Sequence, residues 1–135
     1  MIQQKEIVLS EHSRGFHLIT DEILSQIELP KAGILNLFIK HTSASLTINE
    51  NFDSTVLDDF ETVFNLLVPE DMPYYTHTVE GSDDMPAHIK SSLTDSSINI
   101  PITDGKLNLG EWQGIYLCEF RNRARSRKLV ITIYS

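Results

Sequence analysis

The stretch SINIPITDGKLNL, residues 97–109, decides the fold class of this 135-residue chain. Isoleucines occupy every second position from Ile98 to Ile102, and the Asp104-Gly105 pair follows them. Such alternation is typical of a strand with one buried face, and Asp-Gly is a strong hairpin signal. Leu107 and Leu109 resume the apolar pattern after the pair. The stretch therefore predicts a hairpin, and with it a sheet that is antiparallel or mixed.

Strand chemistry continues on both sides of this hairpin. We expect two strands after it, at Trp112–Phe120 and Leu129–Tyr134, and one near the start of the chain, at Gln3–Ser10. The Trp112 indole is expected in the core. Ile34–Ile39 is almost continuously apolar, which predicts a strand covered on both faces. Apolar and polar residues alternate in Ser45–Asn49, which predicts a strand with one polar face.

Helical periodicity appears in the segments between these strands. Apolar residues recur at helical spacing in Asp53–Val68, and a proline ends that segment. Asp84–Leu93 has apolar residues at every fourth position, which predicts a second helix with its polar residues on the other side. Thr20 is expected as the N-cap of a short helix that ends before Pro30. We therefore predict one α+β domain over residues 1–135, with a mixed or antiparallel sheet or sandwich and two to three helices.

Composition excludes several classes of function. The chain has 11 basic and 19 acidic residues and a net charge of −8, so nucleic acid and anionic membranes would repel it. No apolar run approaches the roughly 20 residues of a membrane helix, and the polar N-terminus is unlike a signal peptide. The single Cys118 has no disulfide partner and is expected to be buried. We expect a cytoplasmic protein without a nucleic acid or membrane partner.

The charges are unevenly distributed along the chain. No lysine or arginine lies between Lys40 and Lys90, whereas five basic residues fall within Arg121–Lys128. Such a cluster can bind phosphate, or it can be a solvated hairpin loop between two strands. The acidic middle and the basic end either fold together into a cation-and-phosphate site or meet across neighbouring subunits.

Three histidines are the first candidates for chemistry: His41 after an expected strand, His77 before a glycine turn, and His88 in the second expected helix. Asp84 lies four residues before His88, so its carboxylate can accept one imidazole N–H and leave the other nitrogen free for a metal or a proton. Three protein ligands with an open position are typical of catalytic zinc. The spacing matches no short metal motif, and the alternative for each histidine is a hydrogen-bonded surface or capping residue.

Carboxylates next to turns form the second group of candidates. Asn49 and Asp53 follow a strand and open a helix, where an aspartate is usually an N-cap and only sometimes a general base. Glu80 and Asp83 flank a glycine turn and can bind a hard cation through oxygen, or they can belong to a solvated turn. Together with Asp84, they lack the regular one-in-two spacing of a calcium loop.

Four blocks of the sequence carry a family resemblance. They are HTSASLTINEN at 41–51, H-x-x-E-G-S-D-D-M-P-A-H-I-K-S-S-L at 77–93, GEWQGIYL at 110–117 and SRGFH at 13–17. In this order and spread, the chain resembles the YjbQ-like family of small bacterial and archaeal proteins. Two positions depart from the family pattern. Glu111 stands where a threonine is usual, and Phe120 stands where a histidine is common.

The resemblance implies a fold, an assembly and an activity. It implies a compact α+β subunit in a homotrimer, with the polar blocks near the subunit boundaries. The implied activity is that of a secondary thiamine phosphate synthase, which joins hydroxymethylpyrimidine pyrophosphate to thiazole phosphate and releases pyrophosphate. The site expected from the matching blocks comprises His41, His77, His88, Asn49, Asp53, Glu80, Asp83 and Gln113, with Ser43, Ser45, Arg121 and Arg127 as candidates for binding phosphate.

Three functions are open for such a site. The first is the transferase, in which a divalent cation, magnesium, bridges pyrophosphate oxygens and arginines hold the phosphates. The second is a zinc-type hydrolase with His41, His77 and His88 as metal ligands and a bound water as nucleophile. The third is a non-enzymatic homotrimer that binds a small phosphorylated metabolite. We favour the transferase because the resemblance supports it.

Overall fold

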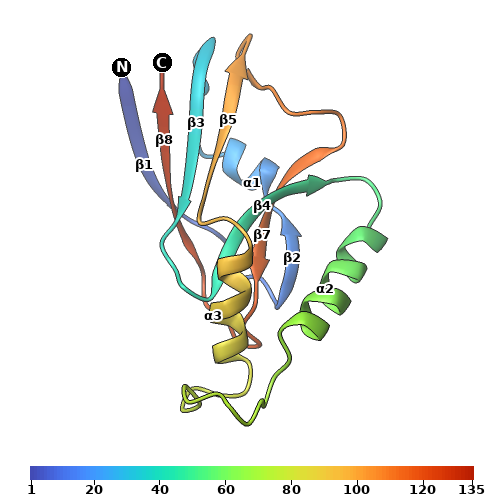
Figure 1. Ribbon diagram of the computed structural model, residues 1–135. Helices are drawn as coiled ribbons and strands as arrows, with labels where there is room; N and C mark the ends of the chain where they lie inside the picture. Colours follow the sequence, from blue (N-terminus) through green and yellow to red (C-terminus); the bar gives the residue numbers. More distant parts are fainter.

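The computed structural model describes residues 1–135, which form two antiparallel sheets and three helices (Figure 1). The five-stranded sheet has the order β1-β8-β3-β5-β6, and the three-stranded sheet has the order β2-β7-β4. The predicted α+β fold is confirmed. The strands are β1 (Ile2–Val8), β2 (Gly15–Leu18), β3 (Ala32–Ile39), β4 (Ala44–Glu50), β5 (Ser97–Thr103), β6 (Lys106–Leu107), β7 (Gln113–Glu119) and β8 (Lys128–Tyr134). The helices are α1 (Thr20–Leu24), α2 (Thr55–Leu67) and α3 (Asp84–Leu93).

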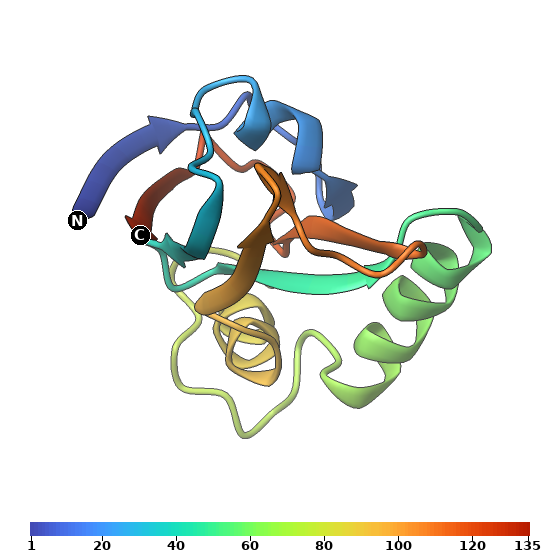
Figure 2. The same cartoon turned by 90° about the horizontal axis from the view of Figure 1, so that it is seen from above.

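The two sheets enclose one apolar core. It is built from alternate residues of the strands, such as Leu35, Leu37 and Ile39 of β3, all of them buried. Burying a branched side chain of this size contributes roughly 1.5–3 kcal/mol. Seen from above, α2 and α3 lie outside the sheets, next to β4 and away from β1 and β8 (Figure 2). The core therefore fixes the sheets, and both longer helices stand on the three-stranded sheet.

Within one chain, the predicted coverage of β3 on both faces is wrong. Ile34 and Phe38, which alternate with the buried residues, are 48% and 45% exposed. The helices pack against the three-stranded sheet, so the outer face of the five-stranded sheet is open. A continuous apolar run in this strand therefore reflects a buried inner face and an apolar outer one.

The turn at residues 104–105 forms as predicted, but the later loop does not. Asp104 and Gly105 both have positive φ, 52° and 76°, as a two-residue hairpin turn requires. Arg121–Lys128 is no hairpin loop, because β7 and β8 belong to different sheets and the segment crosses between them. Trp112 is 52% exposed, not in the core, because its indole packs against Phe52 at the surface.

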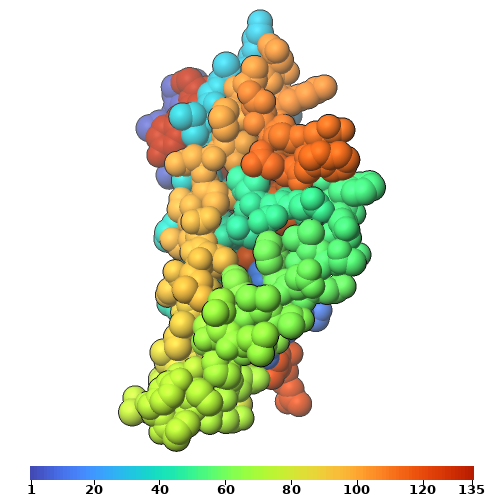
Figure 3. Space-filling view, turned by 45° about the vertical axis from the view of Figure 1, so that its right-hand side comes forward, coloured from blue at the N-terminus to red at the C-terminus, as the bar shows by residue number.

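The helices agree with the predicted positions but differ in detail. Thr20 is the first residue of α1 and not its N-cap, because its hydroxyl accepts a hydrogen bond from the backbone N–H of Ile115 at 2.9 Å. An aromatic cluster holds α2 against the sheet, with Phe60 and Phe64 at 5.4 and 5.5 Å from the ring of Phe16. These contacts place α2 on the same face as α3 (Figure 3).

α3 buries part of its polar side. Its fully buried residues include Asp84 and Lys90, whereas Leu93 is 55% exposed. The two charges have partners inside, because Arg121 binds Asp84 and Asn65 accepts a hydrogen bond from Lys90 Nζ at 2.6 Å. Burial lowers the pKa of Lys90. The charged groups of α3 are therefore held by defined partners beneath the surface, a setting suited to a functional site.

Candidate functional site

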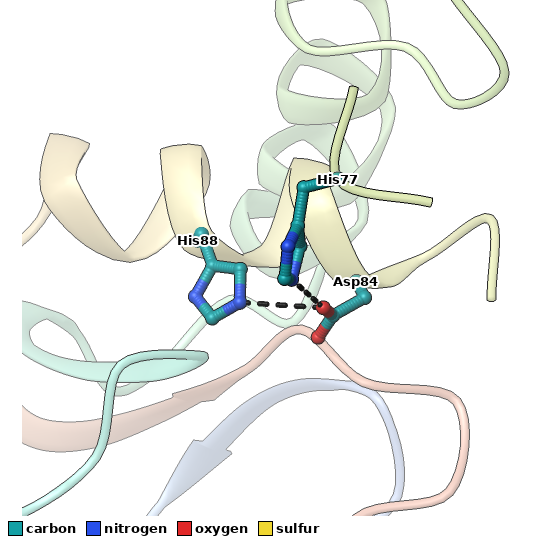
Figure 4. A group of neighbouring side chains, drawn as sticks. All are labelled: His77, Asp84 and His88. Carbon is teal, nitrogen blue, oxygen red and sulfur yellow. Dashed lines mark hydrogen bonds and ion pairs between the residues drawn. The ribbon is translucent and has the colours of Figure 1, made fainter. Parts of the chain in front are cut away.

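His77, Asp84 and His88 form the one group of histidine and carboxylate side chains close enough to hold a metal ion (Figure 4). Their ligand atoms lie within 4.8 Å of one another. Nε2 of His77 lies 2.7 Å from Oδ2 of Asp84, and Nε2 of His88 lies 3.3 Å from the same oxygen. Asp84 and His88 are one turn apart on α3, and His77 belongs to the preceding connection. We call these three residues the histidine–aspartate cluster.

Hydrogen bonding fixes the orientation of the His88 ring. Nδ1 of His88 lies 3.0 Å from the carbonyl oxygen of Thr42, which can only accept, so Nδ1 carries a hydrogen. In a neutral ring Nε2 is then unprotonated, and it faces Oδ2 of Asp84. Two lone pairs repel at this distance unless a cation, either a proton or a metal ion, lies near both. A backbone carbonyl on the far nitrogen is also the usual support of a metal-binding histidine.

Arg121 organises the carboxylates around this cluster. Asp84 is 1% exposed, and its Oδ1 accepts a hydrogen bond from Nη1 of Arg121 at 2.5 Å. Nε of Arg121 donates to Oδ2 of Asp83 at 2.8 Å, and Nη2 donates to the carbonyl oxygen of Glu80 at 3.0 Å. Burial opposes ionisation of Asp83, but hydrogen bonds from the Asn122 backbone and Arg121 lower its pKa. Arg121 therefore pairs with carboxylates and is not a free phosphate ligand.

His41 does not join the cluster. Its Nε2 accepts a hydrogen bond from the backbone N–H of Lys128 at 2.8 Å, which occupies one ring nitrogen. Burial and the nearby Arg127 guanidinium lower the pKa of His41. His41 instead lines a pocket of about 490 Å³ together with His88. The structure thus brings together two of the three predicted metal ligands.

The remaining candidates for binding phosphate lie inside the protein. Arg127 is buried and makes two hydrogen bonds of 2.6 Å to the carboxylate of Glu119, from Nε and Nη2. Nη2 also donates to Oγ of Ser43 at 3.0 Å. Ser45 is buried and bonds to the hydroxyl of Thr94. Arg127 therefore joins the 121–127 segment to β7 and to Ser43 before β4, and Ser45 joins β4 to Thr94 after α3, so the polar groups of all three candidates are engaged within the protein.

Asn49, Asp53 and Gln113 lie at the other end of the β4–β7 strand pair. Glu50 at the end of β4 is in register with Gln113, whereas Ala44, close to His41 in the chain, is in register with Glu119. A strand of seven residues is about 20 Å long. Within one chain, this second group is therefore separated from the histidine–aspartate cluster by the length of the strands.

The side chains of this second group bond within their own loops. Each accepts a hydrogen bond from a backbone N–H one to three residues away. Asp53 also accepts from the Thr55 hydroxyl, so it holds the first residue of α2 from one position before the N-cap, which is Ser54 and not Asp53 as expected. The backbone bonds run from Glu50 to Asn49 Oδ1 at 2.8 Å, from Thr55 to Asp53 Oδ1 at 2.9 Å, and from Gly110 to Gln113 Oε1 at 2.8 Å.

Asp84 belongs to the histidine–aspartate cluster but is missing from the site that the resemblance implied. Its spacing of four from His88 was the available signal, because it predicted contact between the two side chains. The contact exists, but the free nitrogen is not where that spacing placed it. Thr42 takes Nδ1 of His88, and Asp84 faces Nε2 beside His77. No sequence signal pointed to the Thr42 carbonyl.

Fold and site together define an α+β protein with a candidate metal centre of two histidines and one carboxylate. The chain belongs to the UPF0047 protein YjbQ-like family, whose model matches residues 5–135. It is 49% identical over 136 residues to the UPF0047 protein YjbQ of Escherichia coli O157:H7, which covers 98% of both chains. It is 42% identical over 132 residues to UPF0047 protein sll1880 of Synechocystis, covering 96% of this chain and 90% of that one.

Solved structures agree with this assignment. A conserved hypothetical protein from Thermus thermophilus has a TM-score of 0.85 at 30% identity, covering 96% of this chain and 99% of that one. An uncharacterised YjbQ/UPF0047 family protein from Clostridium acetobutylicum has a TM-score of 0.78 at 36% identity, covering 98% and 99%. None of these names states a reaction. The helices of this chain are all too short or too polar to cross a membrane.

Proposed function

We propose that this protein is a divalent-metal-dependent enzyme that acts on a small phosphorylated molecule at the histidine–aspartate cluster. The observation that carries the proposal is the approach of Nε2 of His88 to Oδ2 of Asp84, with Nδ1 of the same ring donating to Thr42. This arrangement favours a cation between the ring and the carboxylate. Two imidazoles and a carboxylate suit zinc or another first-row transition metal better than magnesium, which prefers oxygen ligands.

We propose, as the reaction, the transfer of the thiamine phosphate synthase type that the family resemblance implies. When bound, the metal ion would neutralise charge on the departing pyrophosphate. His77, His88 and Asp84 would hold it, and the Thr42 carbonyl would keep the His88 ring in its orientation. Arg121 would fix Asp84 through Oδ1 and leave Oδ2 for the metal. Most of the catalysis would come from positioning and charge stabilisation.

The donor set also favours a second candidate, a metal-dependent hydrolase. Two histidines, one carboxylate and an open position form the ligand pattern of many catalytic zinc sites. Such a site would use a bound water as the nucleophile on the same phosphorylated substrate. The two candidates differ in their requirement for an acceptor, because hydrolysis proceeds without thiazole phosphate and transfer does not.

We also propose that the chain assembles as a homotrimer. The outer face of the five-stranded sheet supports an interface, since Ile2, Tyr134 and Ile34 lie in one register row across β1, β8 and β3. They are 64%, 47% and 48% exposed. A row of exposed apolar residues on a sheet face is typical of a surface that another subunit covers. Light scattering that gives the mass of a single chain would contradict this assembly.

The test of function compares His77→Ala with His12→Ala, both purified from cells that lack the ordinary synthase. His12 is a matched control because it bonds to Glu22, outside the cluster. We expect bound metal and thiamine phosphate formation in the wild type and in the control, and neither in His77→Ala. Hydrolysis of hydroxymethylpyrimidine pyrophosphate in the absence of thiazole phosphate would select the hydrolase. Binding of the substrates without any turnover, in wild type and control alike, would leave a non-enzymatic binding protein.

A further inference from the structure

The pocket beside the histidine–aspartate cluster has an unusual wall. Its volume is about 490 Å³, and five of its eight lining residues are serines or threonines. His41 and His88 supply the two rings of the wall, and no lysine, arginine or carboxylate lines it. The pocket can therefore hold a small ring, but its wall has no permanent cation with which to bind a phosphate.

Two of the five hydroxyl groups of this wall, those of Ser91 and Ser92, donate their hydrogens to backbone carbonyl oxygens. Oγ of Ser91 donates to the carbonyl oxygen of Thr42 at 2.7 Å, and Oγ of Ser92 donates to the carbonyl oxygen of His88 at 3.1 Å. A hydroxyl has one hydrogen to donate and two lone pairs. These side chains therefore present lone pairs to a ligand and act as acceptors.

The position of the pocket at the C-terminal end of α3 also favours a ligand that donates hydrogen bonds. Ser91 and Ser92 lie in the last turn of this ten-residue helix, and Thr94 is its C-cap. The last carbonyl groups of a helix have no partner within it, and together they carry about half a negative charge. This end of the helix repels anions and attracts hydrogen-bond donors. The cluster stands towards the other end, where Asp84 is the first helical residue.

We infer that the pocket binds the uncharged, hydrogen-bond-donating part of the substrate, a small ring that bears amino or hydroxyl groups. The phosphates of the same molecule lie at the histidine–aspartate cluster, a placement that rests on the proposed function. His88 belongs to both places, because it lines the pocket and faces Asp84. The substrate therefore lies along α3, with its charged end towards Asp84 and its donor end towards Thr94.

Binding of three probes to the full chain tests this inference without turnover. The probes are 4-aminopyrimidine, pyrimidine without the amino group, and inorganic pyrophosphate. They are titrated by calorimetry and by backbone amide NMR, with and without added zinc. We expect 4-aminopyrimidine to bind about tenfold more tightly than pyrimidine, the effect of one added hydrogen bond, and to shift the amides of residues 91–96. Pyrophosphate should need zinc and should shift residues 77–88.

A pair of variants with opposite charge sharpens the test. Ser96 lines the pocket, is exposed and makes no side-chain hydrogen bond, so Ser96→Lys and Ser96→Glu should both fold. An ammonium group would occupy the acceptors, so Ser96→Lys should weaken 4-aminopyrimidine binding about tenfold, and Ser96→Glu should retain it. Tighter pyrophosphate binding by Ser96→Lys, equal binding of the two pyrimidines, or no shift at 91–96 with any probe would overturn the inference. Pocket binding by 4-aminopyrimidine without any zinc binding would instead remove only the proposed metal function.

Discussion

The two ends of the β4–β7 strand pair carry polar residues of similar types in different arrangements. At the end near Ala44 and Glu119, the polar side chains belong to distant parts of the chain and bond to one another. At the end near Glu50 and Gln113, the side chains of Asn49, Asp53 and Gln113 each bond to the backbone of their own loop, and the long-range bond is the one from Asn51 Nδ2 to the carbonyl oxygen of Gln113. The first end brings side chains from distant segments into one cluster, whereas the polar side chains at the second end mainly stabilise the loops to which they belong.

This difference distinguishes a side chain that several distant partners hold in position from a side chain that only bonds at the start of a helix. Asp84 is held from three directions, by His77, His88 and Arg121, which lie 7, 4 and 37 residues away in the chain. Such a group is costly to bury, and it is kept only where its partners are fixed. A side chain at the start of a helix, such as that of Asp53, needs one neighbouring N–H and is exposed. Convergence of distant segments, and not residue type, therefore identifies the candidate site.

We call the end near Ala44 and Glu119 the convergent end, because distant segments of the chain meet there. Removing the charge of Asp84 at this end should have the largest effect. Asp84→Asn keeps the shape of the side chain but loses a metal ligand, so we expect zinc affinity and turnover to fall about 100-fold or more. Asp53→Asn at the other end is the matched control and should leave zinc affinity unchanged. Calorimetric zinc titration measures both. Because Asp84 is buried, His77→Ala, whose side chain is 49% exposed, repeats the test in a variant that should fold. Unchanged zinc affinity in both Asp84→Asn and His77→Ala would contradict the assignment of the metal site to the convergent end.

Breaking the buried pair at the same end should have the next largest effect, on stability. Arg127→Met leaves the carboxylate of Glu119 buried without its cation and with only the hydrogen bond from the Arg121 backbone N–H, which should lower the free energy of unfolding by about 3–5 kcal/mol. Urea denaturation measures the change. The double variant Arg127→Met/Glu119→Leu removes both charges and should recover most of the loss. If the single variant is as stable as the wild type, the pair does not hold the 121–127 segment in place.

Local patterns predicted most of the fold. The Asp104-Gly105 turn, the Asp53–Val68 helix and the alternation of β5 depend on residues close in the chain, and all three were correct. Contacts between distant segments were not predictable in the same way. The coverage of β3, the path of Arg121–Lys128 and the buried side of α3 depend on which sheet each element joins, and no local pattern encodes this choice.

The candidate site shows the same division. The sequence indicated His77 and His88 by residue type and block, and the i, i+4 spacing indicated contact of His88 with Asp84. It did not separate these residues from Asn49, Asp53 and others that lie about 20 Å away along the strands. Nor did it show that Arg121 and Arg127 pair with buried carboxylates. Both facts follow from strand register and burial, which depend on the whole fold.

Removing the Asp53 side chain at the other end should have a smaller effect. Asp53→Ala removes the hydrogen bonds to Thr55 at the start of α2, so we expect the Tm to fall by about 2–4 °C with zinc affinity unchanged. Thermal unfolding followed by circular dichroism measures the change, and Asp95→Ala, which is exposed and outside any helix, is the control. Turnover lost at unchanged zinc affinity would show that this end completes the site of a neighbouring subunit, and the contrast between the two ends would then hold only within one chain.

The smallest expected effect is a dependence of stability on pH that comes from His41 at the convergent end. Its folded pKa is lowered by burial and by Arg127, and its Nε2 accepts the Lys128 N–H only when that nitrogen is unprotonated. The unfolded chain therefore binds a proton more readily, so the His41 contribution is complete above the ordinary histidine pKa of about 6.5 and is lost as the pH falls through the folded pKa. In His41→Gln the amide oxygen can accept the same N–H without titrating. Urea denaturation from pH 8 to pH 5 should therefore show a steeper loss of stability in the wild type than in His41→Gln, because the two proteins differ only at this side chain. Parallel curves would mean that His41 is as easily protonated in the folded chain as in the unfolded one, and that the Lys128 contact does not hold its ring.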